Sequence, residues 1–113
     1  MRISTHVLDT VSGKPAAGVP VQLFHREASG DWRRLASART DSDGRCAQFL
    51  PTDEKLAPGE YRLEFDTAAY HSAQKVDGLY PSVSINFVVR SGQSHFHIPL
   101  LLSPNGYTTY RGS

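Results

Sequence analysis

The sequence predicts an all-β sandwich of about eight strands with one short helix. Short apolar stretches alternate with polar residues, and clusters of glycine, proline, aspartate and serine separate these stretches. The clearest period of two lies in residues 61–66, where Tyr61, Leu63 and Phe65 alternate with charged residues. Residues 67–75 lack that period. Many short strands divided by turns are typical of two antiparallel sheets packed face to face.

The first half of the chain predicts four strands. Residues 11–18 contain the glycines and prolines of a turn, and residues 27–30 form a hairpin loop between two alternating stretches. Residues 41–44 are a turn, because aspartate caps backbone N–H groups and glycine adopts positive φ. The expected strands cover residues 3–9, 19–25, 32–40 and 45–49.

The second half predicts four more strands and the helix. A capping aspartate or threonine at positions 66 and 67 would begin two helical turns over residues 67–75. Ser91 and Gly92 join two later strands, and residues 103–106 form the last turn. The expected strands cover residues 61–66, 82–90, 94–102 and 107–111.

The composition is that of one globular domain without a strongly charged surface. The 113 residues fit a single domain over 1–113, with 39% hydrophobic and 20% charged residues. A formal net charge of +1 gives no reason to expect nucleic acid or a membrane as a partner. The one cysteine, Cys46, excludes an internal disulfide, and we expect a buried small residue rather than a nucleophile. No apolar leader follows Met1, so we expect a cytoplasmic protein.

Several residues could carry chemistry, although each alone is typical of an ordinary strand. His6 lies in the first strand, and His95 and His97 share one face of a later strand because they are two residues apart. Two histidines at this spacing can chelate zinc, but no cysteine or carboxylate at ligand spacing lies near them. A partly exposed strand face is therefore the favoured interpretation. Arg45 and Tyr110 are, by themselves, typical surface and edge residues.

Four separated segments form a pattern that no single residue provides. They are His6-Val-Leu-Asp-Thr10 with Gly13-Lys-Pro-Ala16, Thr40-Asp-Ser-Asp-Gly-Arg-Cys46, His97-Ile-Pro-Leu-Leu-Leu-Ser-Pro104, and Gly106-Tyr-Thr-Thr-Tyr-Arg-Gly-Ser113. In order and spacing, over essentially the whole chain, they resemble the 5-hydroxyisourate hydrolases, the enzyme branch of the transthyretin-like family. Phe96 stands where a tyrosine is common, which is a conservative departure.

The resemblance implies a transthyretin-like sandwich assembled as a homotetramer, a dimer of dimers with active sites in the channel where dimers meet. The implied reaction is hydrolysis of 5-hydroxyisourate to 2-oxo-4-hydroxy-4-carboxy-5-ureidoimidazoline in urate catabolism, with no metal or organic cofactor. Transthyretin itself, a hormone carrier, lacks the histidines, the arginine and the terminal motif. The implied catalytic residues are His6, Arg45, His97 and Ser113, and the implied substrate-binding residues are His6, Arg45, Tyr110, Arg111 and Gly112.

This reaction explains why such residues would be needed. Water must lose a proton, a developing oxyanion must be stabilised, and the leaving ring nitrogen must gain a proton. Histidine suits both proton transfers because its pKa lies near neutrality. The planar guanidinium of an arginine can donate hydrogen bonds to adjacent acceptors of the ring and can stabilise the oxyanion. Either histidine could be the base; we favour His97, on the expectation that it lies on a central strand and His6 near a terminus. Ser113 could act through its hydroxyl or its carboxylate.

An alternative function is a non-catalytic carrier that binds a small planar ligand in the same channel. A carrier has no use for paired proton-transfer groups, so the two histidines and Arg45 favour the hydrolase.

Overall fold

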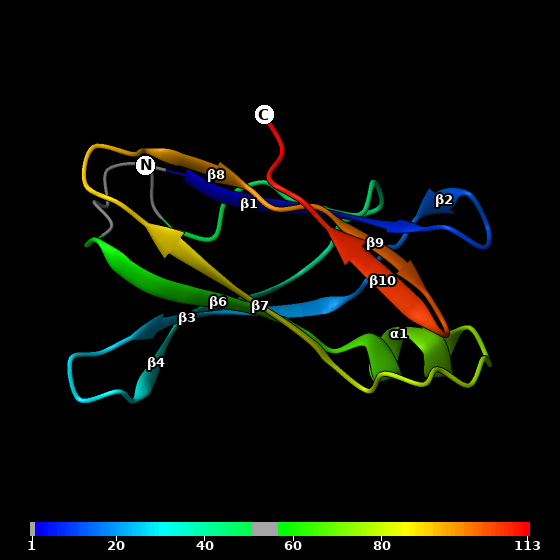
Figure 1. Cartoon of the computed structure of the whole chain (residues 1–113). Coiled ribbons are helices and arrows are strands. Elements are labelled where there is room, and N and C mark those ends of the chain that lie inside the picture. The colour runs from blue at the N-terminus through cyan, green and yellow to red at the C-terminus, as the bar shows by residue number, and fades with distance from the viewer. Residues whose placement is uncertain (1, 51–56) are drawn as a thin grey trace.

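The computed structural model describes residues 2–50 and 57–113. These residues form ten strands and one helix, drawn in Figure 1. In chain order they are β1 (Arg2–Asp9), β2 (Lys14–Pro15), β3 (Pro20–Arg26), β4 (Trp32–Arg39), β5 (Arg45–Cys46), β6 (Gly59–Phe65), α1 (Thr67–Ala73), β7 (Val83–Val89), β8 (His95–His97), β9 (Leu100–Ser103) and β10 (Gly106–Thr109).

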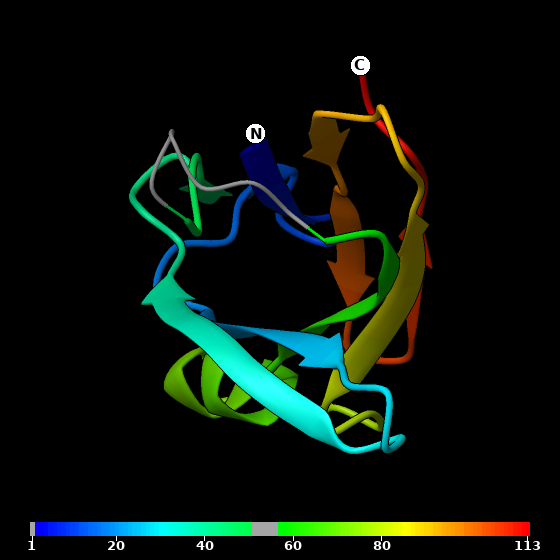
Figure 2. The same cartoon turned by 90° about the vertical axis from the view of Figure 1, so that its left-hand side faces the viewer.

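The strands form two sheets. In Figure 1, β1, β8 and β9 lie in the upper layer and β3, β4 and β6 in the lower one, and Figure 2 shows the same sandwich turned by 90°. Among the described residues, one sheet has six strands in the order β10-β9-β1-β2, with β5 and β8 also paired to β1. The other has four strands in the order β4-β3-β6-β7. The predicted two-sheet sandwich with one short helix is therefore confirmed.

The alternating side chains of both sheets fill the space between the layers. Tyr61, Leu63 and Phe65 of β6 are almost completely buried, as their period of two predicts. Val21 and Leu23 of β3 and Ile3 and Val7 of β1 are completely buried in the same core. Because these residues point inward, the alternate residues of β1 point to the opposite face of the six-stranded sheet.

β1 is the central strand of the six-stranded sheet. It pairs in antiparallel fashion with β2 and β5, and in parallel fashion with β8 and β9. His6 therefore lies on the central strand, whereas His97 lies on β8, whose one strand partner among the described residues is β1. This arrangement is the reverse of our expectation that His97 would occupy the central strand.

Several strand boundaries differ from the expected ones. The stretch expected over 94–102 is divided into β8 and β9, and Pro99 lies between them without an N–H group to donate to a ladder. Lys14 and Pro15, expected in a turn, pair with β1 as β2. β5 is shorter than the expected strand over 45–49, and β10 ends at Thr109, two residues before the expected end.

The helix α1 begins where the sequence predicts and closes one end of the sandwich (Figure 1). The side chain of Asp66 accepts a hydrogen bond from the backbone N–H of Ala69, so this aspartate is the N-cap. The helix is attached to β1 by Tyr70, whose hydroxyl donates to Oδ2 of Asp9 at 2.7 Å. The helix ends at Ala73, two residues before the predicted end.

Candidate active site

Strand pairing brings three predicted catalytic side chains to one face of the six-stranded sheet. In the pairing of β1 with β5, His6 lies opposite Arg45, and in the pairing of β1 with β8, Ser4 lies opposite His97. Directly paired residues point to the same face, as do residues two apart along a strand. His6, Arg45 and His97 therefore share the face turned away from the core. The C-terminal end of the chain lies on this side of the sheet (Figure 1).

The turn between β4 and β5 orients the His6 ring. Oδ1 of Asp41 accepts hydrogen bonds from the backbone N–H groups of Asp43 and Arg45, each at 2.9 Å. Gly44 closes the turn at φ 76°, where a Cβ would collide with a backbone oxygen of β1. The carbonyl oxygen of Asp43 accepts from Nε2 of His6 at 2.8 Å. Because a carbonyl oxygen can only accept, Nε2 carries the hydrogen and the neutral ring keeps its lone pair at Nδ1.

His97 is held between β1 and the C-terminal residues. Oγ of Ser4, a residue that is 6% exposed, lies 2.8 Å from Nδ1 of His97. On another side, a Cβ at Gly112 would lie 2.6 Å from Cδ2 of the ring. Burial, and then the positive charges of Arg45 and His6, lower the pKa of His97 below its ordinary value of 6.5. The ring is therefore neutral at pH 7.

The residues after β10 approach the same face. The guanidinium carbon of Arg111 lies 4.8 Å from the centre of the Phe96 ring, and Nη2 donates to the carbonyl oxygen of His95 at 3.3 Å. One residue later, Gly112 forms an isolated antiparallel bridge with His97. These contacts bring Ser113 to the cavity that His97 lines.

A cavity of about 250 Å³ opens on this face. Drug-sized ligands occupy sites of about 300–1,000 Å³, so this volume suits a smaller molecule. Two arginines, Arg2 and Arg45, give the cavity a positive character. Its lining residues are Arg2, Ser4, Thr5, Arg45, Ala47, His95, His97 and Ser113.

Three predicted residues line this cavity, and sequence reasoning missed others. Arg45, His97 and Ser113 were selected from the sequence, whereas Arg2 and His95 were not assigned a role. The two missed residues are opposite each other in the pairing of β1 with β8, and each lies two positions from a residue of the same face. The period of two along a strand, which predicted that His95 and His97 share a face, could therefore also have identified Arg2 and His95 as site residues.

The other predicted site residues lie beside the cavity rather than in its lining. His6 is close enough that its protonated form lowers the pKa of His97. Tyr110, which is 55% exposed, and Arg111 line a separate, mainly apolar hollow of about 170 Å³ together with Phe96 and residues of β7. Contact of the substrate with Tyr110, Arg111 and Gly112 remains a prediction.

Cys46 lies next to Arg45 but does not have the character of a nucleophile. It is 7% exposed, and burial, together with the negative charge of Asp41, raises the pKa of its thiol to about 11. The thiol is therefore protonated at neutral pH and packs as a small apolar residue.

Within residues 2–50 and 57–113, no group of three or more histidine, cysteine, aspartate or glutamate side chains is arranged to hold a metal ion. In the same part of the chain, no helix has the length and apolar character needed to cross a bilayer.

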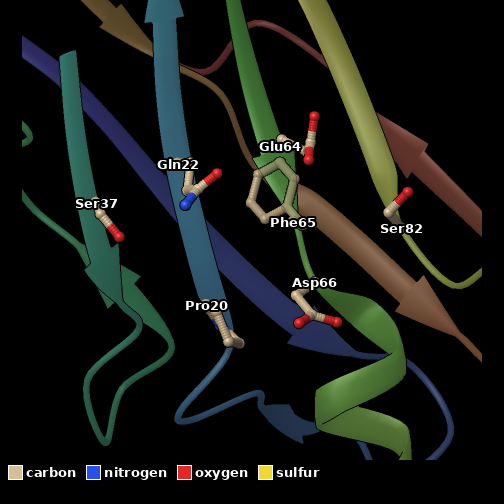
Figure 3. A pocket seen from close by; sticks show the side chains of 7 residues that line it. All are labelled: Pro20, Gln22, Ser37, Glu64, Phe65, Asp66 and Ser82. Carbon is tan, nitrogen blue, oxygen red and sulfur yellow. The ribbon is translucent and has the colours of Figure 1, made fainter. Parts of the chain in front are cut away.

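A second polar hollow, of about 210 Å³, lies on the four-stranded sheet and is drawn in Figure 3. Ser37, Gln22 and Glu64 come from three neighbouring strands and are paired in register. Asp66 also faces this hollow, but its Oδ1 caps the helix. No histidine, arginine or lysine of the described chain lines it. Its lining therefore offers neither the imidazole nor the cation that the other face provides.

Comparison with known proteins identifies the family of this chain over almost its whole length. A family model described as the HIUase/Transthyretin family matches residues 3–112. The 5-hydroxyisourate hydrolase of Mus musculus is 45% identical over 112 residues, which cover 98% of this chain and 94% of that protein.

Two solved structures show how closely the fold is shared. The 5-hydroxyisourate hydrolase of Klebsiella pneumoniae superposes with a TM-score of 0.86 at 37% identity, covering 100% of both chains. Sea bream transthyretin, solved in complex with thyroxine, superposes with a TM-score of 0.92 at 31% identity, covering 99% of this chain and 95% of that one. The fold is thus common to an enzyme and a hormone-binding protein, and the site residues must distinguish them. This chain belongs to the HIUase/transthyretin family.

Proposed function

We propose that this protein hydrolyses 5-hydroxyisourate to 2-oxo-4-hydroxy-4-carboxy-5-ureidoimidazoline, a step of urate catabolism. The chain is an enzyme of the hydrolase branch, since curated relatives at 42–45% identity along almost all of it are 5-hydroxyisourate hydrolases. The observation that carries the proposal is the shared face of His6, Arg45 and His97, with Ser113 beside them.

The hydrogen bonds favour His6 as the base that activates water. Nε2 of His6 donates to Asp43, while Nδ1 makes no hydrogen bond within the described residues. In the proposed step, Nδ1 takes a proton from water as the water oxygen bonds to the ring acyl carbon. When the carbon–nitrogen bond then breaks, the same imidazolium returns its proton to the leaving ring nitrogen. One water is consumed and His6 ends neutral. This division of roles reverses the preference for His97 that the sequence suggested.

Arg45 and His97 would stabilise the charge that forms on the attacked carbonyl oxygen. The backbone of Arg45 is fixed by Asp41, whereas its guanidinium is exposed at the cavity. A planar fork can contact two neighbouring acceptors of a urate-like ring. Pre-positioned donors of this kind contribute about 10²–10³-fold to turnover. Ser113 would help to orient the water or a histidine through its hydroxyl or its carboxylate.

A carrier of a small planar ligand is the second candidate. The TM-score of 0.92 to a transthyretin solved with thyroxine favours it. The paired histidines and Arg45 argue against it, because proton-transfer groups have no role in reversible binding of a neutral planar molecule. The fold likeness alone cannot outweigh the chemistry of the site.

One assay decides between these functions. Freshly generated 5-hydroxyisourate decays in buffer, and its ultraviolet absorbance and circular dichroism can be followed with and without the purified protein. We expect a decay rate that rises in proportion to protein concentration. A decay rate equal to that of buffer, with saturable binding of the compound, would reject the hydrolase and support the carrier.

We also propose that the protein assembles as a homotetramer. Arg45, His95 and Ser113 are exposed in the single chain, so a neighbouring subunit against this face would exclude water from the site. Sedimentation equilibrium at micromolar concentration should give a mass of about four chains. A monomer with full activity would overturn this proposal and leave the assigned reaction standing.

A further inference from the structure

We propose that Ser4 is a positioning residue that holds His97 as a neutral hydrogen-bond donor, with the ring hydrogen on Nε2. The inference concerns this chain's own hydrogen bonds, and its catalytic consequence rests on the proposed hydrolase function. His97 would then stabilise the oxyanion without ever giving up its proton.

The direction of the hydrogen bond between Ser4 and His97 follows from the number of hydrogens available. Ser4 is 6% exposed, and its Oγ has one hydrogen-bond partner among the described residues, Nδ1 of His97 at 2.8 Å. If Nδ1 were the donor, the hydroxyl hydrogen of this nearly buried serine would have no protein acceptor among the described residues, which is unfavourable. If the hydroxyl is the donor, its only hydrogen is used and Nδ1 accepts. The neutral ring must then carry its hydrogen on Nε2.

The position of Ser4 relative to His97 is fixed by the backbone. The backbone N–H of Ile98 donates to the carbonyl oxygen of Ser4 at 2.9 Å, and the hydroxyl of Thr5 donates to the carbonyl oxygen of Ile98 at 2.5 Å. The serine hydroxyl therefore approaches the ring from a rigid ladder rather than from a loop.

The other contacts of the ring leave Nε2 as the nitrogen available for chemistry. Gly112 covers the ring near Cδ2, and Ser4 occupies Nδ1. His97 lines the cavity beside Arg45, so Nε2–H and the guanidinium could both donate to one developing oxyanion. Burial and the surrounding cations hold the pKa of His97 low, which keeps the ring neutral and agrees with this role. Removing the serine hydroxyl would free the ring to rotate and to exchange tautomers.

The tautomer can be measured without any assay of activity. Two-bond ¹H–¹⁵N correlation spectra of the ¹⁵N-labelled protein at neutral pH distinguish a bare ring nitrogen from a protonated one. For the wild-type protein we expect a bare Nδ1 and a protonated Nε2 on His97. Ser4→Thr, which keeps a hydroxyl, should give the same spectrum, and Ser4→Ala should give a mixture. A wild-type ring protonated at Nδ1 would overturn the proposal, even in a fully active enzyme.

Kinetics then test whether the tautomer matters. We expect Ser4→Ala to lower kcat by about 10- to 100-fold with a similar KM, as for other partners that orient a functional histidine. Ser4→Thr should recover most of this loss. Ser103→Ala is a matched control, because the hydroxyl of this serine donates a hydrogen bond to the carbonyl oxygen of Gly106 at the far end of β9, away from His97. A kcat for Ser4→Ala equal to that of wild type would show that the serine has no positioning role. Absence of activity in wild type would instead reject the proposed function and leave the tautomer measurement valid.

Discussion

The backbone N–H of Gly112 donates to the carbonyl oxygen of His97 at 2.7 Å, so the residues after β10 pair directly with the strand that carries a proposed catalytic histidine. This close approach requires the absence of a side chain at position 112, because a Cβ would lie 2.6 Å from the ring. The position of the His97 ring is thus coupled to the position of the tail, residues 110–113.

The first prediction concerns this contact. Gly112→Ala should force the ring or the tail to shift, and a misplacement of about 1 Å can reduce kcat by about 10²-fold. Gly106→Ala is a suitable control, since a Cβ there would meet only Ser103 Oγ at an ordinary 3.8 Å. Initial rates and thermal melting should show low activity in the first variant with little change in Tm. Equal activity of the two variants would show that the ring position does not depend on Gly112.

The second prediction concerns the two histidines. His6→Asn and His97→Asn should each keep the fold and lower kcat by about 10²–10⁴-fold, the usual contribution of such groups. The double variant should lose much less than the product of the two effects, because both act in one step. His25→Asn controls for the substitution itself, because this histidine lies in the other sheet, where its ring centroid is 4.5 Å from that of Tyr61. Near wild-type turnover in either single variant would remove that histidine from the mechanism.

The third prediction concerns Arg45. Arg45→Lys keeps the positive charge but loses the planar fork, so kcat/KM should fall by about 10-fold or more while Tm stays nearly the same. Arg33→Lys, at an exposed position outside the cavity, should leave both quantities unchanged. If the two lysine variants have the same kinetics, Arg45 contributes no more than charge.

The fourth prediction separates the two chemical groups of Ser113. Ser113→Ala removes the hydroxyl and keeps the carboxylate, whereas adding a few residues after Ser113 moves the carboxylate and keeps the hydroxyl. If the carboxylate orients water or a histidine, the extended protein should have the lower kcat. The opposite order would assign the role to the hydroxyl, and full activity in both proteins would exclude Ser113 from the mechanism.

The fifth prediction is a pH dependence of stability at the other end of the sandwich. Burial opposes ionisation of Asp9, but the hydroxyl of Tyr70 and the backbone N–H groups of Ser12 and Val11 outweigh it and hold its pKa below the ordinary 3.8. A lowered carboxyl pKa stabilises the fold above about pH 4, and this contribution is lost as the pH falls through the folded-state value.

Tyr70→Phe removes that hydrogen bond and should lower the free energy of unfolding at pH 7 by about 1–3 kcal/mol. The difference from wild type should shrink as the pH falls below 3.8 and through the lowered pKa of Asp9, because the carboxylate then becomes protonated in both proteins. Urea denaturation of both proteins at pH 7 and pH 3 measures this difference in the free energy of unfolding. A difference that does not change with pH would mean that the hydroxyl acts through packing and not through the ionised carboxylate.

Most of the fold could be predicted from local patterns in the sequence. Tyr61, Leu63 and Phe65 predicted β6 because a half-buried strand needs a period of two, and Asp66 predicted the start of α1 because it can cap backbone N–H groups. The division between β8 and β9 was missed, although Pro99 was a signal for it.

The site could be predicted only in part, because its geometry depends on pairing between distant segments. The period of two placed His95 and His97 on one face, and the family resemblance selected His6 and Arg45. Which residue faces His97 across the ladder is set by the register of β1 with β8, and no local pattern encodes that register. Ser4 therefore could not be recognised as the partner of His97 from the sequence.

The parallel pairing of β1 with β8 and β9 has a consequence for biosynthesis. The hydrogen bond from Ser4 to His97 joins residues 93 positions apart, so β1 leaves the ribosome long before its parallel partners exist. The hairpin of β3 and β4 can form early, but the central strand of the other sheet must wait with its apolar face uncovered. Catalytic competence should therefore be among the last properties that a newly made chain acquires, and nascent chains should be most prone to aggregate just before residues 95–103 emerge.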